Sequence, residues 1–179
     1  MTQQNKVRII EVVKPNPRWK YEYKEESEKV LSIMGDEIVE IHHIGSTSIS
    51  GIYAKPIIDI LIGVKNISEV DKYDKEMVNI GYTPKGEYGI KGRRFYLKGE
   101  IKRTHHIHIF EIDSPHIKRH LNFRDYMNTH PKDAKRYEDL KKDLASEFRY
   151  DNEAYCDGKD DFIKEIDKKA EEWDKEIQN

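Results

Sequence analysis

Small and hydroxyl-bearing residues precede an acidic strand residue in the segment that runs from Gly45 to Asp59. The turn of Gly45, Ser46 and Thr47 offers backbone amides and hydroxyls of the kind that hold phosphate groups. Lys55 stands just before a proline, where its amino group could bring a positive charge to the same phosphate. Asp59 follows Ser46 after twelve intervening residues and is the single charge in the run IIDILIGV. This order predicts a phosphate-binding turn that faces a catalytic carboxylate.

Two histidines lie on a later apolar run, and their spacing suits metal binding. Neighbouring side chains of a strand point to opposite faces, so His106 and His108 lie together, opposite the isoleucines between them. Two imidazoles at this spacing can reach one metal ion, with Asp59 as a third ligand. A hydrogen-bonded or solvated pair is the alternative. Loop amides could likewise satisfy Asp59, although a metal or a cationic partner is favoured because burying an unpartnered carboxylate is costly.

The strand predicted before the histidines carries two more polar residues in alternation. Arg94 and Tyr96 alternate with Phe95 and Leu97. If the apolar residues of every strand face the helices, then Arg94 and Tyr96 share the remaining face with Asp59. The pattern therefore predicts one open-faced site, with Arg94 as a phosphate ligand.

Three cations occupy helix positions that should be apolar. Arg124, Lys141 and Lys159 each lie three or four residues from an apolar residue of a predicted helix stripe. A long side chain that extends its charge to solvent explains any one of them. Three together predict an anion-binding pocket to which all of them contribute.

The elements that must position these residues follow from hydrophobic periodicity and turn signals. Strands are expected near residues 7–13, 38–43, 57–64, 93–98 and 105–111, the last two forming a hairpin. Helices are expected at about residues 17–34 and 68–80, and the chain becomes helical from Ser114 onward. No linker or repeat divides residues 1–179. We expect one α+β domain: a mixed sheet with helices on one face and a helical C-terminal part.

The composition of the chain restricts the partners that it can bind. The chain has 32 Lys and Arg against 34 Asp and Glu, a formal charge of -2, so no extended nucleic-acid surface is predicted. It contains one cysteine and no apolar run near the ~20 residues of a membrane span. We expect a cytoplasmic protein without a membrane partner.

Four motifs together resemble the GrpB family. They are HIGSTSISGIYAKPIIDILIGV, RTHHIHIFE, HLNFRDYMNTHP and YCDGKDDFI, and they follow one another along nearly the whole chain. The resemblance implies membership of the nucleotidyltransferase superfamily related to polymerase β. In that superfamily a Gly-Ser turn precedes a strand with two acids one residue apart, which bind the Mg²⁺ ions that hold nucleotide phosphates.

The chain departs from that pattern at one position. Asp59 is present, but Leu61 stands where the second acid is expected, and a hydrocarbon cannot bind Mg²⁺. The two histidines could complete a different site with Asp59, for Mn²⁺, Fe²⁺ or Zn²⁺.

Three functions are consistent with these residues. The first is a nucleotidyltransferase-type enzyme that acts on a nucleotide or another phosphorylated small molecule, with a divalent metal as cofactor. The second is a nucleotide sensor or interaction module that lost turnover with Leu61. The third is a metal-dependent hydrolase that uses Asp59, His106 and His108. The helical tail is also a candidate homodimer surface.

Overall fold

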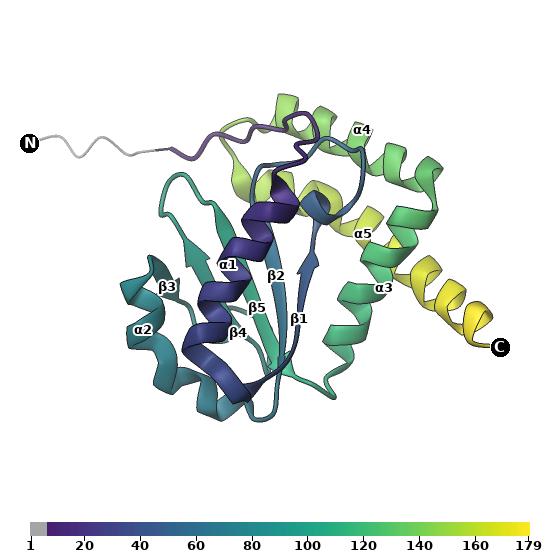
Figure 1. Ribbon diagram of the computed structural model, residues 1–179. Coiled ribbons are helices and arrows are strands. Elements are labelled where there is room, and N and C mark those ends of the chain that lie inside the picture. The colour runs from purple at the N-terminus through teal and green to yellow at the C-terminus, as the bar shows by residue number, and fades with distance from the viewer. Residues whose placement is uncertain (1–6) are drawn as a thin grey trace, which may run out of the picture.

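A five-stranded mixed sheet forms the centre of the computed structural model, which describes residues 7–179 (Figure 1). The strand order is β1-β2-β5-β4-β3, in which β2 and β5 are parallel and the other neighbours are antiparallel. The strands are β1 Ile38–Ile44, β2 Ile58–Val64, β3 Tyr82–Pro84, β4 Arg94–Lys98 and β5 His105–Glu111. This confirms the predicted α+β class with a mixed sheet.

The N-terminal helices cover one face of the sheet. Alternate residues of β2 and β5 point to this face, and Ile58, Ile60, Ile107 and Ile109 are almost fully buried there. They pack in one cluster with residues of three helices, which are α1 Trp19–Met34, the 3₁₀ helix η3 Ile67–Tyr73 and α2 Asp74–Asn79. Near-continuous apolar sequence is typical of an interior strand that is covered on both faces, and β2 lies between β1 and β5, although β5 is the middle strand of the five.

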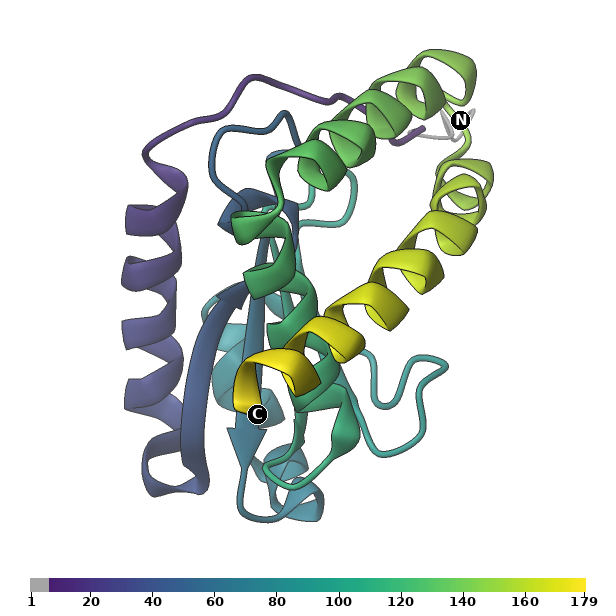
Figure 2. The same ribbon diagram turned by 90° about the vertical axis from the view of Figure 1, so that its right-hand side faces the viewer.

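The C-terminal helices approach the second face of the sheet. They are α3 Pro115–Thr129, α4 Pro131–Glu147 and α5 Asn152–Gln178. Figure 2 shows α1 on one side of the sheet and α3 with α5 on the other. Ile44, Leu61 and Phe110 pack against Ile117 of α3. Asp59 lies at the end of the sheet where β1 ends and β2 begins, level with Ile44.

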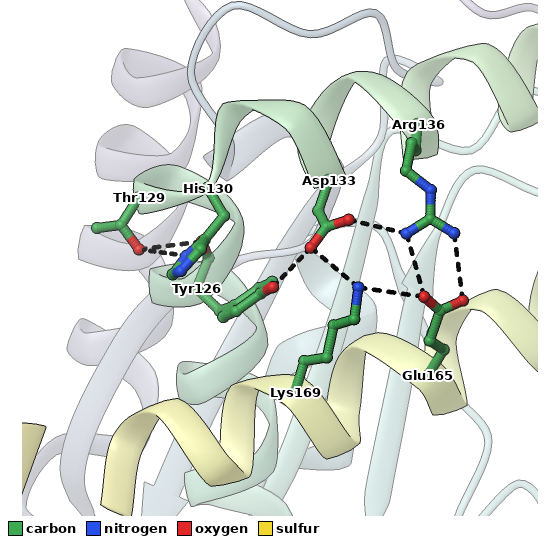
Figure 3. Close-up of polar contacts among 7 residues, drawn as sticks. All are labelled: Tyr126, Thr129, His130, Asp133, Arg136, Glu165 and Lys169. Carbon is green, nitrogen blue, oxygen red and sulfur yellow. Dashed lines mark hydrogen bonds and ion pairs between the residues drawn. The ribbon is translucent and has the colours of Figure 1, made fainter. Parts of the chain in front are cut away.

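A polar network joins the three C-terminal helices (Figure 3). Asp133 of α4 accepts hydrogen bonds from Tyr126 of α3, from Arg136 at 2.8 Å and from Lys169 of α5 at 3.4 Å. Glu165 of α5 pairs with the same two cations. The network fixes α4 between its neighbours and so helps to set where the cations of α4 and α5 lie.

One expected strand is absent from the described residues, and one short strand was not expected. Residues 7–13 form no strand, and only Val13 makes a bridge, with Ala54. The alternating apolar residues there serve another purpose, since Ile10 packs against Leu144 and Tyr155 of the C-terminal helices. The short strand β3 was not predicted, because three residues that end in Pro84 carry too little pattern.

Candidate functional site

Asp59 lies between two histidines, as the strand alternation predicts. Parallel pairing puts Asp59 of β2 level with His106 of β5 and Leu61 level with His108, so all four share one face. Asp59 Oδ1 lies 3.2 Å from His108 Nε2 and 3.5 Å from His106 Nδ1. The carboxylate is 24% exposed, so a ligand at this end of the sheet can reach it.

The contacts of the two histidines define their protonation. His108 Nδ1 lies 3.4 Å from Arg93 Nη1, a group that can only donate, so Nε2 carries the hydrogen that faces Asp59. Burial lowers the pKa of His108 more than the carboxylate raises it. Burial alone would raise the pKa of Asp59, but hydrogen bonds from His106 and His108 hold it well below its usual range. The pair is therefore a neutral imidazole that donates to an ionised carboxylate.

His106 has a free nitrogen. Its Nδ1 faces Asp59, while its Nε2 is buried and has no hydrogen-bond partner among residues 7–179. An orphaned buried nitrogen is costly, so such atoms are expected where a ligand completes the site. Of the six such side-chain atoms in the described residues, five lie at this end of the sheet, in Arg103, His105, His106, Asn152 and Tyr155.

The predicted turn lies directly against Asp59. Gly45 has a φ of 73°, and a Cβ at this position would overlap Asp59 Oδ2, so only glycine allows the turn to approach the acid. The Thr47 hydroxyl lies 2.8 Å from His43 Nε2 and so supports the turn. The Ser46 hydroxyl has no hydrogen-bond partner in the part of the chain that the structure describes.

Three of the predicted phosphate ligands come together. Lys55 and Lys159 lie over the ring of Tyr155, at 4.7 and 4.6 Å from its centroid. Lys141 of α4 is 1% exposed, and its Nζ donates to the backbone oxygen of Tyr53 at 2.7 Å. Burial and the charge of Lys159 lower the pKa of Lys55 to about 8 and that of Lys141 to about 7.

Two arginines that sequence reasoning missed extend this group. Burial and the adjacent Arg103 lower the pKa of Arg8, and the charge of Arg8 in turn lowers the pKa of Lys55. Arg8 lies in the segment that was expected to be a strand and Arg103 in the loop between β4 and β5, and nothing in the local sequence indicates that these two segments meet at Lys55. We call the five residues Arg8, Lys55, Arg103, Lys141 and Lys159 the cation cluster.

The cation cluster is not neutralised by the protein. Within residues 7–179, none of its members forms an ion pair with a carboxylate. Glu138, the acidic residue that affects Lys141, is paired with Lys135 at 2.7 Å and binds the amide of Tyr53. Asp59 is near enough to raise the pKa of Lys55 but is held by the histidines.

Arg94 and Tyr96 lie on the opposite face from the one predicted. Antiparallel pairing puts Phe95, not Arg94, level with His108. Arg94 instead binds Asp71 at 2.7 Å, and Tyr96 donates to Asp74, both among the N-terminal helices. The prediction failed because Phe95 and Leu97 pack on the side of the histidines, so apolar residues do not mark the same face in every strand.

Arg124 lies apart from the two lysines with which it was grouped. Its Nε donates to Asp125 at 2.8 Å, and its Nη1 lies 3.3 Å from the backbone oxygen of His43. It thus supports the end of β1, just before Gly45, and its charge is partly compensated. The pocket predicted from three helix cations contains two of them.

The carboxylates do not fit a two-metal centre. Leu61 is fully buried in the apolar cluster, so the second acid position supplies no ligand. Among the described residues, no group of three or more His, Cys, Asp and Glu side chains has the arrangement of a metal site. Both histidines direct a nitrogen at the same oxygen of Asp59, so a metal ion at the predicted site would have to displace these contacts.

Comparison with known proteins now decides the family. The sequence profile described as GrpB protein matches residues 9–169. The chain belongs to the GrpB family. The crystal structure of the conserved protein GrpB from Enterococcus faecalis superposes with a TM-score of 0.87 and 42% identity, over 89% of this chain and 96% of that one.

Two further likenesses add context. The UPF0157 protein YqkA of Bacillus subtilis is 48% identical over 94% of this chain, which spans about half (49%) of YqkA. Cid1 in complex with the UTP analog UMPNPP superposes with a TM-score of 0.45 and 12% identity, over 76% of this chain and 41% of Cid1. Nothing about the reaction of this GrpB protein follows from so weak a likeness.

Proposed function

We propose that this GrpB protein binds a nucleotide or another phosphorylated small molecule at the end of the sheet where Asp59 meets the cation cluster. The observation that carries the proposal is the set of five cations without a carboxylate partner in the described residues. Gathering like charges and burying an amino group is unfavourable unless an anion compensates for it. A phosphate chain supplies several negative charges and many acceptor oxygens in a small volume.

The elements around the cluster support a small ligand. Its cations come from the N-terminal segment, the loop before β2, the β4–β5 hairpin, α4 and α5. They therefore surround one location and do not form a stripe along the surface. A nucleic-acid backbone would need an extended basic surface, whereas a single phosphorylated molecule needs only this local one.

Lys159 provides the sharpest test of binding. In isothermal titration calorimetry at low salt, we expect Lys159→Met to weaken binding of ATP and of inorganic tripolyphosphate about tenfold or more, because a charge-assisted contact is lost. The matched control is Lys164→Met on the same helix, whose 70% exposed side chain pairs with Asp160. Equal affinities for the unmodified protein and Lys159→Met would refute the proposal.

Turnover is a separate question, on which two observations point in different directions. The free Nε2 of His106, oriented through Asp59, favours an enzyme, because this nitrogen can take a proton from a reacting group. Leu61 in place of an acid favours a sensor without turnover. Pyrophosphate release from a nucleoside triphosphate with Mn²⁺ present, together with an acceptor that gains the nucleoside monophosphate and with loss of both products in Asp59→Asn, would establish nucleotidyl transfer. Pyrophosphate with free nucleoside monophosphate would instead indicate hydrolysis. Release of inorganic phosphate alone would indicate a hydrolase, and binding without either product a sensor.

A further inference from the structure

A groove adjoins the cation cluster on the side of α1. It has a volume of about 810 Å³ and is enclosed by residues 7–11, by α1, by the start of β2 and by the β4–β5 hairpin. Arg8, Lys55 and Arg103 line it and also belong to the cation cluster. Ligand sites for small molecules commonly have volumes of 300–1,000 Å³. The groove is therefore large enough for a nucleotide-sized molecule and open to the cations at one side.

Three buried polar atoms in residues that line this groove have no hydrogen-bond partner among residues 7–179. They are Arg103 Nε, His105 Nε2 and Asn152 Oδ1, and they come from the hairpin, β5 and α5. His105 Nδ1 is already 2.9 Å from the Thr104 hydroxyl, so Nε2 is the nitrogen left to bind a ligand. Arg103 Nε can only donate, and Asn152 Oδ1 can only accept. His105, whose pKa is lowered by burial, and Asn152 are uncharged and suit an uncharged ligand group with hydrogen-bonding atoms, while the Arg103 cation marks the side of the groove next to the phosphates.

The charges of the groove are divided between two walls. On the α1 wall, Glu26 is neutralised by Lys29 and Lys98, at 3.2 and 2.8 Å. Glu22 and Glu25 also line that wall, and neither forms an ion pair within the described part of the chain. Phosphate groups are therefore repelled from α1 and attracted to the cation cluster. A ligand that fills the groove must be anionic at one end and uncharged, with hydrogen-bonding groups, at the other.

We infer that the groove holds the nucleoside part of a nucleoside polyphosphate whose phosphates lie on the cation cluster. This inference rests on the proposed function and specifies its ligand. Inorganic polyphosphate would leave the groove and its three orphaned atoms unused. A sugar phosphate would fill less of the volume and supply no planar ring with donors and acceptors along its edge. The apolar surfaces of Ile57 and Ile101 line the groove and suit such a ring.

The test compares ligands that carry three phosphates with and without a nucleoside. Inorganic tripolyphosphate and the four common ribonucleoside triphosphates are titrated into the full chain by calorimetry. We expect at least one nucleotide to bind about tenfold or more tightly than tripolyphosphate. We expect His105→Phe and Asn152→Ala each to weaken that nucleotide about tenfold, because a buried hydrogen bond to the ligand is lost, while tripolyphosphate affinity stays unchanged.

Controls separate the groove from the phosphate site. His42→Phe makes the same exchange on β1, where the ring contacts Glu40, and should change neither affinity. Thermal unfolding shows whether each variant is folded. If His105→Phe does not fold, Asn152→Ala alone tests the groove. Equal binding of nucleotides and tripolyphosphate, or equal weakening of both by the variants, overturns the groove inference and leaves phosphate binding intact. Absence of binding by every ligand overturns both.

Discussion

At the scale of single residues, Asp59 joins two features that are separate in the sequence. Its Oδ1 faces His106 and His108, while its Oδ2 lies where a side chain at Gly45 would begin. The Gly-Ser turn and the histidine pair therefore position the same carboxylate from opposite sides. A substitution in the turn should therefore alter the contacts of the histidines through Asp59, and a substitution of a histidine should alter the turn.

Gly45→Ala tests this link between the turn and the acid. We expect it to lower the free energy of unfolding by roughly 2–4 kcal/mol, because the methyl group overlaps Asp59 Oδ2 and the residue keeps a positive φ. Gly51→Ala is the control for the backbone, because it has a φ of 76° and open space around the added atom. It should cost only about 1 kcal/mol. Denaturant unfolding measures both.

A double variant measures the cost of the steric overlap between a methyl group at position 45 and the Asp59 side chain. In Gly45→Ala combined with Asp59→Ala, the second change makes room for the first, so the combined loss should be smaller than the sum of the single losses. Strictly additive losses would mean that the turn does not depend on the carboxylate.

Lys141 gives the site a dependence on pH. Its pKa in the folded protein is about 7, against an ordinary value near 10.5, so the unfolded chain binds more protons between these two values. The stability of the folded protein should therefore rise, through this residue, as the pH increases from about 7 to 10. The charged groups that act on it are Lys55 and Lys159, which lower its pKa, and Glu138, which raises it.

The variant Lys141→Met removes this titration. Below pH 7 it should be more stable than the unmodified protein, because it buries no charge, and the difference should shrink as the pH rises towards 10. Chemical unfolding at several pH values checks the sign. A gain in stability that grew with pH would contradict the assignment.

At the scale of elements, α4 and α5 are as important to the site as the strands. Lys141 and Lys159 come from these two helices, and Asp133 links both to α3. The helices also pack through Tyr137 and Phe162, whose rings stack at 5.4 Å. Because the polar network and this stacking act together, the spacing of the two lysines is part of the helix packing.

Asp133→Ala should loosen this packing. We expect a loss of about 1–2 kcal/mol in the free energy of unfolding, because Tyr126, Arg136 and Lys169 lose their common acceptor. Asp139→Ala on the same helix is the control, since Asp139 is 57% exposed and its one ion pair within residues 7–179 is with Lys135. Urea denaturation measures the difference, and the free energy of unfolding should fall with urea concentration at the same slope for each variant. An equal effect of the two substitutions would mean that the network adds nothing to stability.

At the scale of the whole molecule, the sequence predicts a mixed sheet, an interior position for β2 and the pairing of Asp59 with two histidines, because strong alternation and long apolar runs carry this information. It misplaces Arg94, because alternation alone does not say which face of β4 meets the histidines. It also misses Arg8 and Arg103, whose role depends on how distant segments meet.

Other predictions stay open. The homodimer, the cytoplasmic location and a bound divalent metal stay predictions. No helix in the described part of the chain has the length and apolar character to cross a bilayer. The phosphate-binding roles of Ser46 and Lys55 stay predictions.

The parallel pairing of β2 with β5 has a consequence for the time at which the site appears. Asp59 and His108 are 49 positions apart, and Lys141 and Tyr53 are 88 apart. Contacts between such distant positions form slowly, because a long loop must close first. On the ribosome, Asp59 emerges well before its imidazole partners, and the last cation, Lys159, comes later still. The proposed binding site should therefore be among the last parts of the protein to assemble, and a nascent chain without α5 should not bind the proposed ligand.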